Sequence, residues 1–426
     1  MKSSSSALAS LEPLHYHHKR ERYVNKERLG LFLLWLLGAT TVFSLFILYA
    51  PRPFKFSPRQ ELNARKVYIK PKHDYENCDL FNGRWIPDLS GPLYTNWTCS
   101  TIPDSKKCGK HGRKDVDYLN WRWKPYECEL QKFDAKNFLS IIQGKTIAFI
   151  GDSVARNQME SLLCLLSQEQ TPIDIYKGSN DRFRTWYFPS HDFTIKVLWT
   201  TFFVIAEERI INGTYTGVYD MHLDRLDKKW AEKLPGVDYA IISNGHWFFR
   251  PIYLYERGSV IGCVYCDAEN ISNVSPGFAL QKAFRRALKY INACKECRGL
   301  YIVRTFSPAH FKDGSWNTGG RCNRTSPFTE NQIHLGGTEW EFRTIQAKEI
   351  ERAKKKGEKT GKRFEALDVT KAMLMRPDGH PDLHWNNEFM RGYSDCVHWC
   401  LPGPIDAWND LLTTVLMKED NLSVHN

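Results

Sequence analysis

The hydrophobic pattern of the chain begins with one long apolar run, followed by shorter apolar runs separated by amphipathic stretches. Residues 29–50 (LGLFLLWLLGATTVFSLFILYA) contain no charged side chain. This run is long enough to cross a bilayer as a helix, which needs about 20 residues. A cleaved signal peptide is the competing interpretation, but the run is too long for one, and Pro51 follows where a small-residue cleavage site would lie. We therefore expect an uncleaved membrane anchor.

Beyond the anchor, apolar runs of strand length alternate with helical patterns. The runs that predict buried strands are residues 145–150, 237–243, 300–305 and 364–369. The stretches that predict helices are residues 154–166, 228–234, 278–292 and 405–417. This alternation predicts an α/β fold whose mostly parallel sheet is covered by helices on both faces. Active sites of such sheets form at the carboxyl ends of the strands, where Ser153, Asn244 and residues 306–307 fall.

The regions outside the predicted sheet have a different composition. Residues 73–130 are rich in Cys, Trp, Gly and Pro and have little periodicity, so we expect a small, irregular lobe stapled by disulfides. Residues 51–72 are basic and contain proline, which is typical of a stem. Residues 1–28 then form a short tail, and residues 131–426 form the main domain, in which we expect any catalytic site to lie.

Charge, cysteines and glycosylation sequons predict where these regions lie. Basic residues are slightly more frequent before the anchor than after it, which favours a cytosolic N-terminus and a type II orientation. All 12 cysteines lie beyond the anchor, as expected in an oxidising lumen. The Asn-x-Ser/Thr sequons also lie beyond it, and they begin at Asn96, Asn212, Asn270, Asn273, Asn323 and Asn421. We therefore place residues 51–426 in the lumen of the secretory pathway.

The formal net charge of +11 would fit a nucleic-acid partner, but a lumenal address argues against one. Much of the excess lies beside the anchor and in residues 347–363 (AKEIERAKKKGEKTGKR). We interpret that run as a solvated helix and turn, with contact to an anionic polymer as the alternative.

The Gly151-Asp152-Ser153 turn is the first candidate for chemistry. It lies where a predicted strand passes into a predicted helix, so the serine hydroxyl can be exposed and its N–H lies at a helix N-terminus. The simpler interpretation is an ordinary helix N-cap, because Asp and Ser are both common there. The tripeptide alone therefore does not decide between a nucleophile and a cap.

A catalytic serine needs a base, and His398 stands out among the 14 histidines. Asp395 precedes it by three residues, so the carboxylate can reach the ring Nδ1–H and leave Nε2 free for the serine. The competing interpretation is a structural histidine beside a capping aspartate. The rival bases are His246, His310, His334, His380 and His384, of which His384 also has a near carboxylate in Asp382.

An oxyanion needs a second donor besides the Ser153 N–H. Asn244 follows a predicted strand, and Arg156 and Asn157 lie in the first turn after the serine, so each is a candidate. Ordinary surface hydrogen bonding is the alternative for all three.

The cysteines and tryptophans each allow two interpretations. The pairs Cys263/Cys266 and Cys294/Cys297 have zinc-knuckle spacing, but the oxidising compartment favours disulfides. Cys396 and Cys400 flank His398, and a disulfide there would hold the loop rigid. Loop tryptophans can stack on sugar rings or pack beneath the loops, and they are Trp85, Trp121, Trp123, Trp247, Trp316, Trp399 and Trp408.

Four blocks together resemble the plant trichome-birefringence-like family of polysaccharide O-acetyltransferases. They are CDLFNGRW (78–85), YLNWRWKPYEC (118–128), GDSVARNQ (151–158) and DCVHWCLPGPIDAWN (395–409). The resemblance extends over residues 78–417 and keeps the order of the blocks. It implies a fold similar to that of GDSL/SGNH-type esterases, with Ser153 as nucleophile, Asp395 as acid and His398 as base.

Three further segments are similar to the xyloglucan-acetylating branch of that family. They are SNGHWFFRP (243–251), GCVYC (262–266) and the stretch 304–328. The resemblance implies a Golgi membrane enzyme that acetylates xyloglucan, while relatives act on xylan, mannan or pectin. It implies no bound metal or cofactor, but an acetyl donor is required. Acetyl-CoA and an acetylated membrane carrier are both open, with a donor membrane protein as a further partner.

Two other functions compete with acetyl transfer. A hydrolase uses the same triad with water as the acceptor, and the sequence does not show whether the site excludes water. A non-catalytic polysaccharide-binding protein, with Ser153 as a cap, is the second alternative.

Overall fold

The computed structural model describes residues 75, 77–386 and 392–424, together with Trp35 and Thr40. Lys72–Asn426 forms one compact unit, and Met1–Pro71 forms a second. The predicted tail, membrane anchor and stem lie outside the described residues, apart from Trp35 and Thr40. Within the described part, no helix combines the length and the apolar character that crossing a membrane requires.

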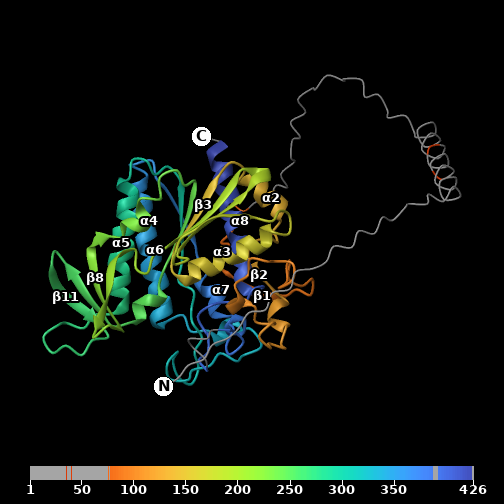
Figure 1. Ribbon diagram of the computed structural model, residues 1–426. Helices are drawn as coiled ribbons and strands as arrows, with labels where there is room; N and C mark the ends of the chain where they lie inside the picture. Colours follow the sequence, from red (N-terminus) through yellow and green to blue (C-terminus); the bar gives the residue numbers. More distant parts are fainter. Residues whose placement is uncertain (1–34, 36–39, 41–74, 76, 387–391, 425–426) are drawn as a thin grey trace, which may run out of the picture. The chain divides into compact units, whose positions relative to one another are not determined.

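A seven-stranded sheet forms the centre of the larger unit (Figure 1). Five neighbouring strands are parallel, and two antiparallel strands extend one edge. In spatial order the strands are β13 (Arg363–Leu367), β12 (Leu300–Arg304), β9 (Tyr239–Ser243), β3 (Thr146–Gly151), β6 (Phe193–Trp199), β5 (Phe183–Phe188) and β4 (Ile173–Lys177). The prediction of a mostly parallel sheet is confirmed, and β13, β12, β9 and β3 coincide with the four predicted strands.

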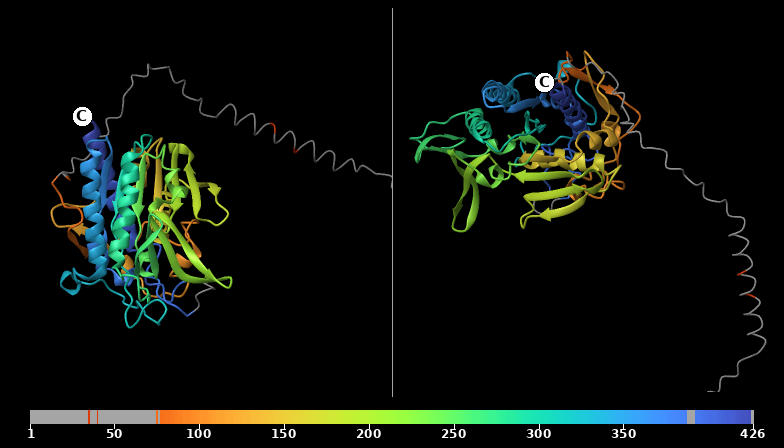
Figure 2. Two further views of the ribbon diagram at one scale, coloured as in Figure 1. Left: turned by 90° about the vertical axis from the view of Figure 1, so that its left-hand side faces the viewer. Right: turned by 90° about the horizontal axis from the view of Figure 1, so that it is seen from above.

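Helices cover both faces because the central strands are apolar on both faces. Along β3, Ile147 and Phe149 point into one core and Ala148 and Ile150 into the other, as the two-residue period of a strand requires. The first core is closed by α2 (Ala135–Ile141), α3 (Ser153–Leu166) and α8 (Ala407–Val424). The second is closed by α4 (Lys228–Ala231), α5 (Pro276–Ala293) and α6 (Gly337–Gly357), of which α5 and α6 lie side by side (Figure 2).

The basic run lies largely on α6. Arg352, Lys355 and Lys356 are exposed there, and a turn follows the helix. This arrangement matches the solvated helix and turn that the sequence predicts.

A second, four-stranded sheet was not predicted from the sequence. Its order is β11-β10-β8-β7, and it lies beside α5 at the left of Figure 1. The strands are β7 (Val204–Ile211), β8 (Thr214–Leu226), β10 (Ile252–Glu256) and β11 (Ser259–Val264). Only one face of this sheet packs on the second core, through residues such as Met221 and Leu254. Along its strands, apolar residues therefore alternate with polar ones, and the continuous apolar runs of the central sheet are missing.

The N-terminal lobe contains a short hairpin and little other regular structure. β1 (Gly83–Pro87) pairs with β2 (Trp121–Pro125), and two 3₁₀ turns, η1 (Asp104–Lys106) and η2 (Asp117–Leu119), lie between them. Trp123 is fully buried, and its Nε1 donates to the Leu80 carbonyl at 2.9 Å. The prediction of an irregular, disulfide-stapled lobe is confirmed.

All 12 cysteines pair in disulfides. The pairs are Cys78–Cys128, Cys99–Cys164, Cys108–Cys400, Cys263–Cys266, Cys294–Cys297 and Cys322–Cys396. Each Cys-x-x-Cys segment closes on itself, so neither provides zinc ligands. A disulfide between Cys396 and Cys400 was expected to hold the His398 loop, and this pairing is wrong. Cys396 is bonded to Cys322 and Cys400 to Cys108, so each cysteine joins the loop to a distant segment.

Most of the tryptophans on loops pack beneath those loops. Trp85, Trp123, Trp399 and Trp408 are buried. Trp121 and Trp247 are half-buried, and Trp316 is 47% exposed. Trp316 is therefore the member of this group with the most free surface for a sugar ring.

Candidate active site

Ser153 begins α3 directly after the carboxyl end of β3. Gly151 has a φ of 154°, and a Cβ at this position would lie 1.7 Å from the Ser243 carbonyl oxygen of the neighbouring strand. Only glycine therefore fits the tight passage from strand to helix. Asp152 is the N-cap, since its Oδ1 accepts a hydrogen bond from the Val154 N–H at 3.0 Å. The capping role belongs to Asp152, and Ser153 is half-buried at the first helical position.

Asp395 and His398 form a hydrogen-bonded pair in the loop before α8. The His398 Nδ1 lies 2.9 Å from Oδ2 and 3.1 Å from Oδ1 of Asp395. Because a carboxylate only accepts, Nδ1 carries the proton and Nε2 is left as the basic atom. Asp395 Oδ1 also accepts the N–H groups of Val397 and His398, so the carboxylate fixes the turn as well as the ring.

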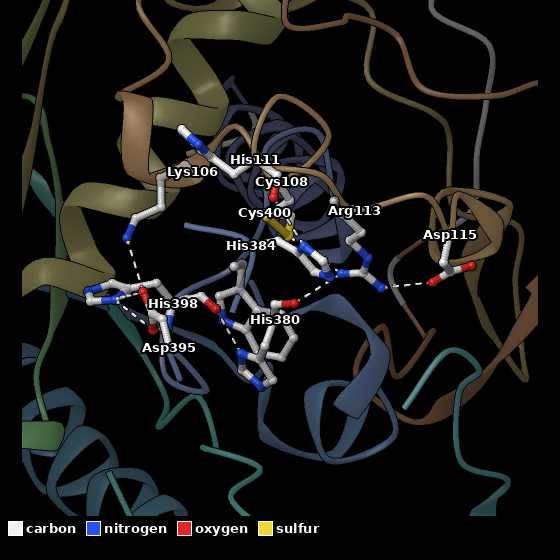
Figure 3. The surroundings of a disulfide bond; sticks show 12 residues. Lys106, Cys108, His111, Arg113, Asp115, His380, His384, Asp395, His398 and Cys400 are labelled. Atoms are coloured by element: carbon white, nitrogen blue, oxygen red, sulfur yellow. Dashed lines mark hydrogen bonds and ion pairs between the residues drawn. A yellow bond between two sulfur atoms is a disulfide. The ribbon is translucent and has the colours of Figure 1, made fainter. Parts of the chain in front are cut away.

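The environment of Asp395 keeps it ionised. Burial alone would raise the pKa of this carboxyl group. The neighbouring His398 and Lys106, with the hydrogen bonds from His398, outweigh burial and hold the pKa well below its usual range. The Lys106 Nζ lies 3.5 Å from Asp395 Oδ2, and both residues are buried (Figure 3).

Asn157 ties the histidine loop to the serine helix. Its Oδ1 accepts the Trp399 N–H at 2.8 Å, and its Nδ2 donates to the Trp399 carbonyl at 3.4 Å. Ser153 lies one helical turn before Asn157 on the same face of α3, and His398 directly precedes Trp399. The two hydrogen bonds therefore hold the serine and the imidazole at the same end of the helix.

The other two predicted oxyanion residues also hold backbone segments. Asn244 is buried, and its Nδ2 donates to the Thr200 carbonyl at 3.0 Å while its Oδ1 accepts the Gly245 N–H at 2.8 Å. Arg156 donates to the Asp181 carbonyl. The Asn244 amide retains one further hydrogen, so its oxyanion role stays a prediction, as do those of Arg156 and Asn157.

His246 is the rival base that lies nearest to the serine turn. Its Nδ1 is 3.9 Å from Asp152 Oδ2, and its ring packs on Phe306 with the centroids 4.7 Å apart. Burial lowers the pKa of His246 to about 4, with smaller contributions from His398 and Arg304 and against the opposing effect of Asp152. His246 is therefore neutral in the physiological range.

The remaining rivals are held by other hydrogen bonds or are exposed. His310 and His380 are hydrogen-bonded to each other at 2.7 Å, and His334 is exposed. Asp382 binds the guanidinium of Arg321 at 2.6 and 2.9 Å, so it does not orient His384. Asp382 also lies near Cys322 and Cys396, but the disulfide between these two cysteines removes both thiolates as metal ligands.

Sequence reasoning missed Lys106 and the separate role of Asp152. Lys106 gives no local signal, because its partner lies at the other end of the chain. The capping role of Asp152 follows only from the position of the first helical residue, which a sequence predicts poorly.

Comparisons with known protein families identify the family of the chain. Residues 130–415 match the PC-Esterase model, described as the GDSL/SGNH-like acyl-esterase family found in Pmr5 and Cas1p. The chain belongs to this family. Residues 76–129 match a second model, the PMR5 N-terminal domain. The PC-Esterase match covers both β3–α3 and the Asp395–His398 loop, whereas Lys106 lies in the PMR5 N-terminal domain.

Individual relatives in this family align over nearly the whole chain. Xyloglucan O-acetyltransferase 4 of Populus trichocarpa is 55% identical over 94% of this chain and 95% of its own length. Xyloglucan O-acetyltransferase 2 of Arabidopsis thaliana is 48% identical over 98% of this chain and 100% of its own. Protein trichome birefringence-like 19 of Arabidopsis thaliana is 42% identical over 82% of each chain. The resemblance to the trichome-birefringence-like family is thereby confirmed.

Proposed function

We propose that this protein is an O-acetyltransferase that transfers an acetyl group through acetyl-Ser153 to a hydroxyl group of xyloglucan. The observation that carries the proposal is the ordered Asp395–His398 pair, which Asn157 ties to the helix that begins with Ser153. The acceptor is supported by the names of the relatives, several of which are xyloglucan O-acetyltransferases.

In the first half-reaction, His398 Nε2 takes the Ser153 hydroxyl proton as Oγ attacks the acetyl carbonyl carbon of the donor. The Oγ–C bond forms, and the bond from that carbon to the donor's leaving group breaks. His398 returns the proton to the leaving group. The Ser153 N–H lies at the first helical position, where the helix offers it no acceptor, so it can stabilise the oxyanion. Asn244 is our candidate for the second donor.

In the second half-reaction, His398 takes the proton of a sugar hydroxyl, and the sugar oxygen attacks acetyl-Ser153. The new ester bond forms as the Oγ–C bond breaks, and the proton returns to Ser153 Oγ. Asp395 stabilises the imidazolium that forms in each half-reaction, because its carboxylate is ionised and 2.9 Å from Nδ1. Free serine and an acetylated polysaccharide result.

A donor is required, and its identity is part of the proposal. Acetyl-CoA and an acetylated membrane carrier both supply the acetyl group with a competent leaving group. We further propose a type II topology in the Golgi membrane with the site in the lumen, and a membrane protein that delivers acetyl groups across the bilayer as a partner.

The lumenal location is supported by the complete pairing of the cysteines, since disulfides are rare in the cytosol. The sequon residues Asn212, Asn270, Asn273 and Asn323 are exposed, as glycosylation requires. Digestion of the full-length protein from plant microsomes with an endoglycosidase tests the lumenal location. We expect a loss of mass, and an unchanged mass together with free thiols would contradict it.

The test of the activity uses full-length protein, an acetyl donor and a panel of hemicellulose oligosaccharides, with products read by mass spectrometry. Acetylated xyloglucan oligosaccharide is the expected product. Ser153→Ala should abolish it, whereas Ser190→Ala, at an exposed serine away from the site, should not. Retained transfer by Ser153→Ala would overturn the proposed intermediate.

Hydrolysis is the second candidate function, favoured by the acyl-esterase description of the family. It differs from transfer only in the acceptor. If acetate accumulates at the same rate with and without oligosaccharide, the enzyme is a hydrolase. If the acetyl group moves to the oligosaccharide and acetate falls, it is a transferase.

A further inference from the structure

Lys106 brings a buried cation from the N-terminal lobe to the carboxylate of the triad. It ends η1 and is 7% exposed, and its Nζ lies 3.5 Å from Asp395 Oδ2. Lysine is almost never buried without a partner. The same Oδ2 accepts from His398 Nδ1 at 2.9 Å, so one carboxylate oxygen faces both a lysine and the catalytic imidazole.

The lobe holds Lys106 in place by contacts on both sides of it. The Lys106 carbonyl accepts the Leu401 N–H at 3.0 Å, and the disulfide Cys108–Cys400 follows two residues later. Arg113 then donates to the His380 carbonyl at 2.9 Å. Figure 3 shows Lys106 pointing at Asp395 while the disulfide joins the two chain segments. The position of the ammonium group is therefore fixed by the fold.

We propose that Lys106 is a positioning residue of the active site, which partly balances the charge of Asp395 and so limits the stabilisation that this carboxylate gives to the protonated form of His398. The PMR5 N-terminal domain thus contributes to the catalytic machinery of the PC-Esterase domain. The inference rests on the Ser153–His398–Asp395 triad of the proposed function.

The effect of Lys106 on the triad is electrostatic. A buried Asp395 without Lys106 would present a full negative charge to His398 Nδ1, and the imidazolium would be favoured over the neutral base. With Lys106 present, the carboxylate charge is partly balanced. The ammonium group thus weakens the preference of Asp395 Oδ2 for an imidazolium partner.

Other ionisable groups also face Lys106 and the triad. Their influence on the pH profile must be distinguished from the influence of Lys106. Glu160 lies on α3, and burial raises its pKa to about 7 although Lys106, Arg156 and Arg184 oppose the shift. His380 and His246 are both held neutral, because burial lowers their pKa values. Glu160 is thus a group on which Lys106 acts directly and which titrates near neutral pH, and Glu160→Gln removes that titration.

The test compares Lys106→Met, which removes the charge, with Lys106→Arg, which retains it, in the full-length protein. Lys110→Met is the matched control, because Lys110 is an exposed lysine of the same segment. The readout is the pH profile of kcat/KM, measured both for 4-nitrophenyl acetate hydrolysis and for acetyl transfer to xyloglucan oligosaccharide, with each variant also made in the Glu160→Gln background.

We expect the acid limb of the Lys106→Met profile to move to higher pH by about one unit. A shift of one pKa unit corresponds to 1.36 kcal/mol, and two unit charges near a protein surface interact by several kcal/mol, so a shift of this size is within reach. At pH 6 this shift lowers kcat/KM roughly tenfold. Lys106→Arg and Lys110→Met should keep the wild-type limb. The shift should persist in the Glu160→Gln background.

A folded Lys106→Met variant with an unshifted acid limb would overturn the inference, as would equal shifts in Lys106→Met and Lys106→Arg. If Lys106→Met does not fold, Lys106→Gln is the second neutral variant. A further outcome is that both neutral variants fail to fold while Lys106→Arg folds and keeps the wild-type acid limb. That outcome supports the pairing of Lys106 with Asp395, because it shows that the buried carboxylate needs a cation. Failure of the proposed function is distinguishable, since it is decided by Ser153→Ala.

Discussion

The turn that carries Ser153 and the loop that carries His398 are fixed by different kinds of contact. The serine turn is local: Gly151 lets β3 pass close to β9, and Asp152 caps α3 one residue before the nucleophile. The histidine loop has no strand or helix to hold it. Disulfides to Cys108 and Cys322, the Asn157 hydrogen bonds and the buried Lys106 hold it instead.

This difference shows how the two halves of the proposed triad depend on the rest of the chain. Ser153 needs only one strand–helix unit, which many α/β folds provide. Asp395 and His398 need segments from the lobe, from the segment between β12 and α6 that carries Cys322, and from α3 itself. Changes at the serine turn should therefore act through backbone geometry, and changes around the loop should act through lost tethers.

The largest effect should come from Gly151→Ala. The added Cβ would lie 1.7 Å from the Ser243 carbonyl, and φ of 154° is unfavourable for alanine. We expect about 4 kcal/mol or more of lost stability, together with loss of activity. Thermal unfolding measures the loss. Gly213→Ala is the control, because its φ is 78° but its Cβ meets nothing within 4 Å. A cost equal to that of Gly213→Ala would show that the close approach is not limiting.

Removal of the Cys108–Cys400 disulfide by the double change to serine should cost about 4 kcal/mol, because its sequence separation of 292 constrains the unfolded chain strongly. Transfer activity should fall as well, since the histidine loop loses a tether. The double change at Cys294 and Cys297, with a separation of 3, should cost less stability and leave activity intact. Similar activity losses in both would argue against a specific role for the tether.

Glu160→Gln should alter how stability depends on pH. Burial raises the pKa of Glu160 from 4.5 to about 7, so its contribution is fully present below pH 4.5 and is lost as pH rises through 7. The loss is about 3 kcal/mol. Urea unfolding at pH 5 and pH 8 should therefore show a smaller difference for Glu160→Gln than for the wild type. An identical difference would mean that Glu160 is ionised in both states at pH 5.

Asn157→Ala should have the smallest effect on stability, about 1–3 kcal/mol, because it leaves the buried Trp399 N–H without its acceptor. It should still lower kcat tenfold or more, because the loop is released from α3. Asn292→Ala is the matched control: this buried asparagine donates to the Ala353 carbonyl far from the site. If both variants lose the same activity, Asn157 has only a structural role.

The sequence predicts four of the seven strands of the central sheet, and misses β6, β5 and β4, for a physical reason. Strands such as residues 145–150 are buried on both faces and therefore appear as continuous apolar runs. The second sheet was missed because β8 and its neighbours bury only one face, so apolar and polar residues alternate along them. The pairing of Asp395 with His398 was predictable because they are three residues apart.

The long-range part of the site could not be predicted from the residues alone. Nothing in the spacing of 12 cysteines selects Cys108 as the partner of Cys400, because loop closure does not specify its partners. Lys106 lies in a segment without periodicity, and its role exists only once that disulfide has brought the lobe to the loop. The oxyanion role of Asn244 remains a prediction, since its amide also binds the Thr200 carbonyl.

The most direct test of the central claim is peptide mass spectrometry of the full-length protein after incubation with an acetyl donor and no acceptor. The account predicts an acetyl group on Ser153, which disappears when xyloglucan oligosaccharide is added and is recovered on the sugar. An acetyl group on another residue, or oligosaccharide acetylated at the wild-type rate by Ser153→Ala, would contradict it.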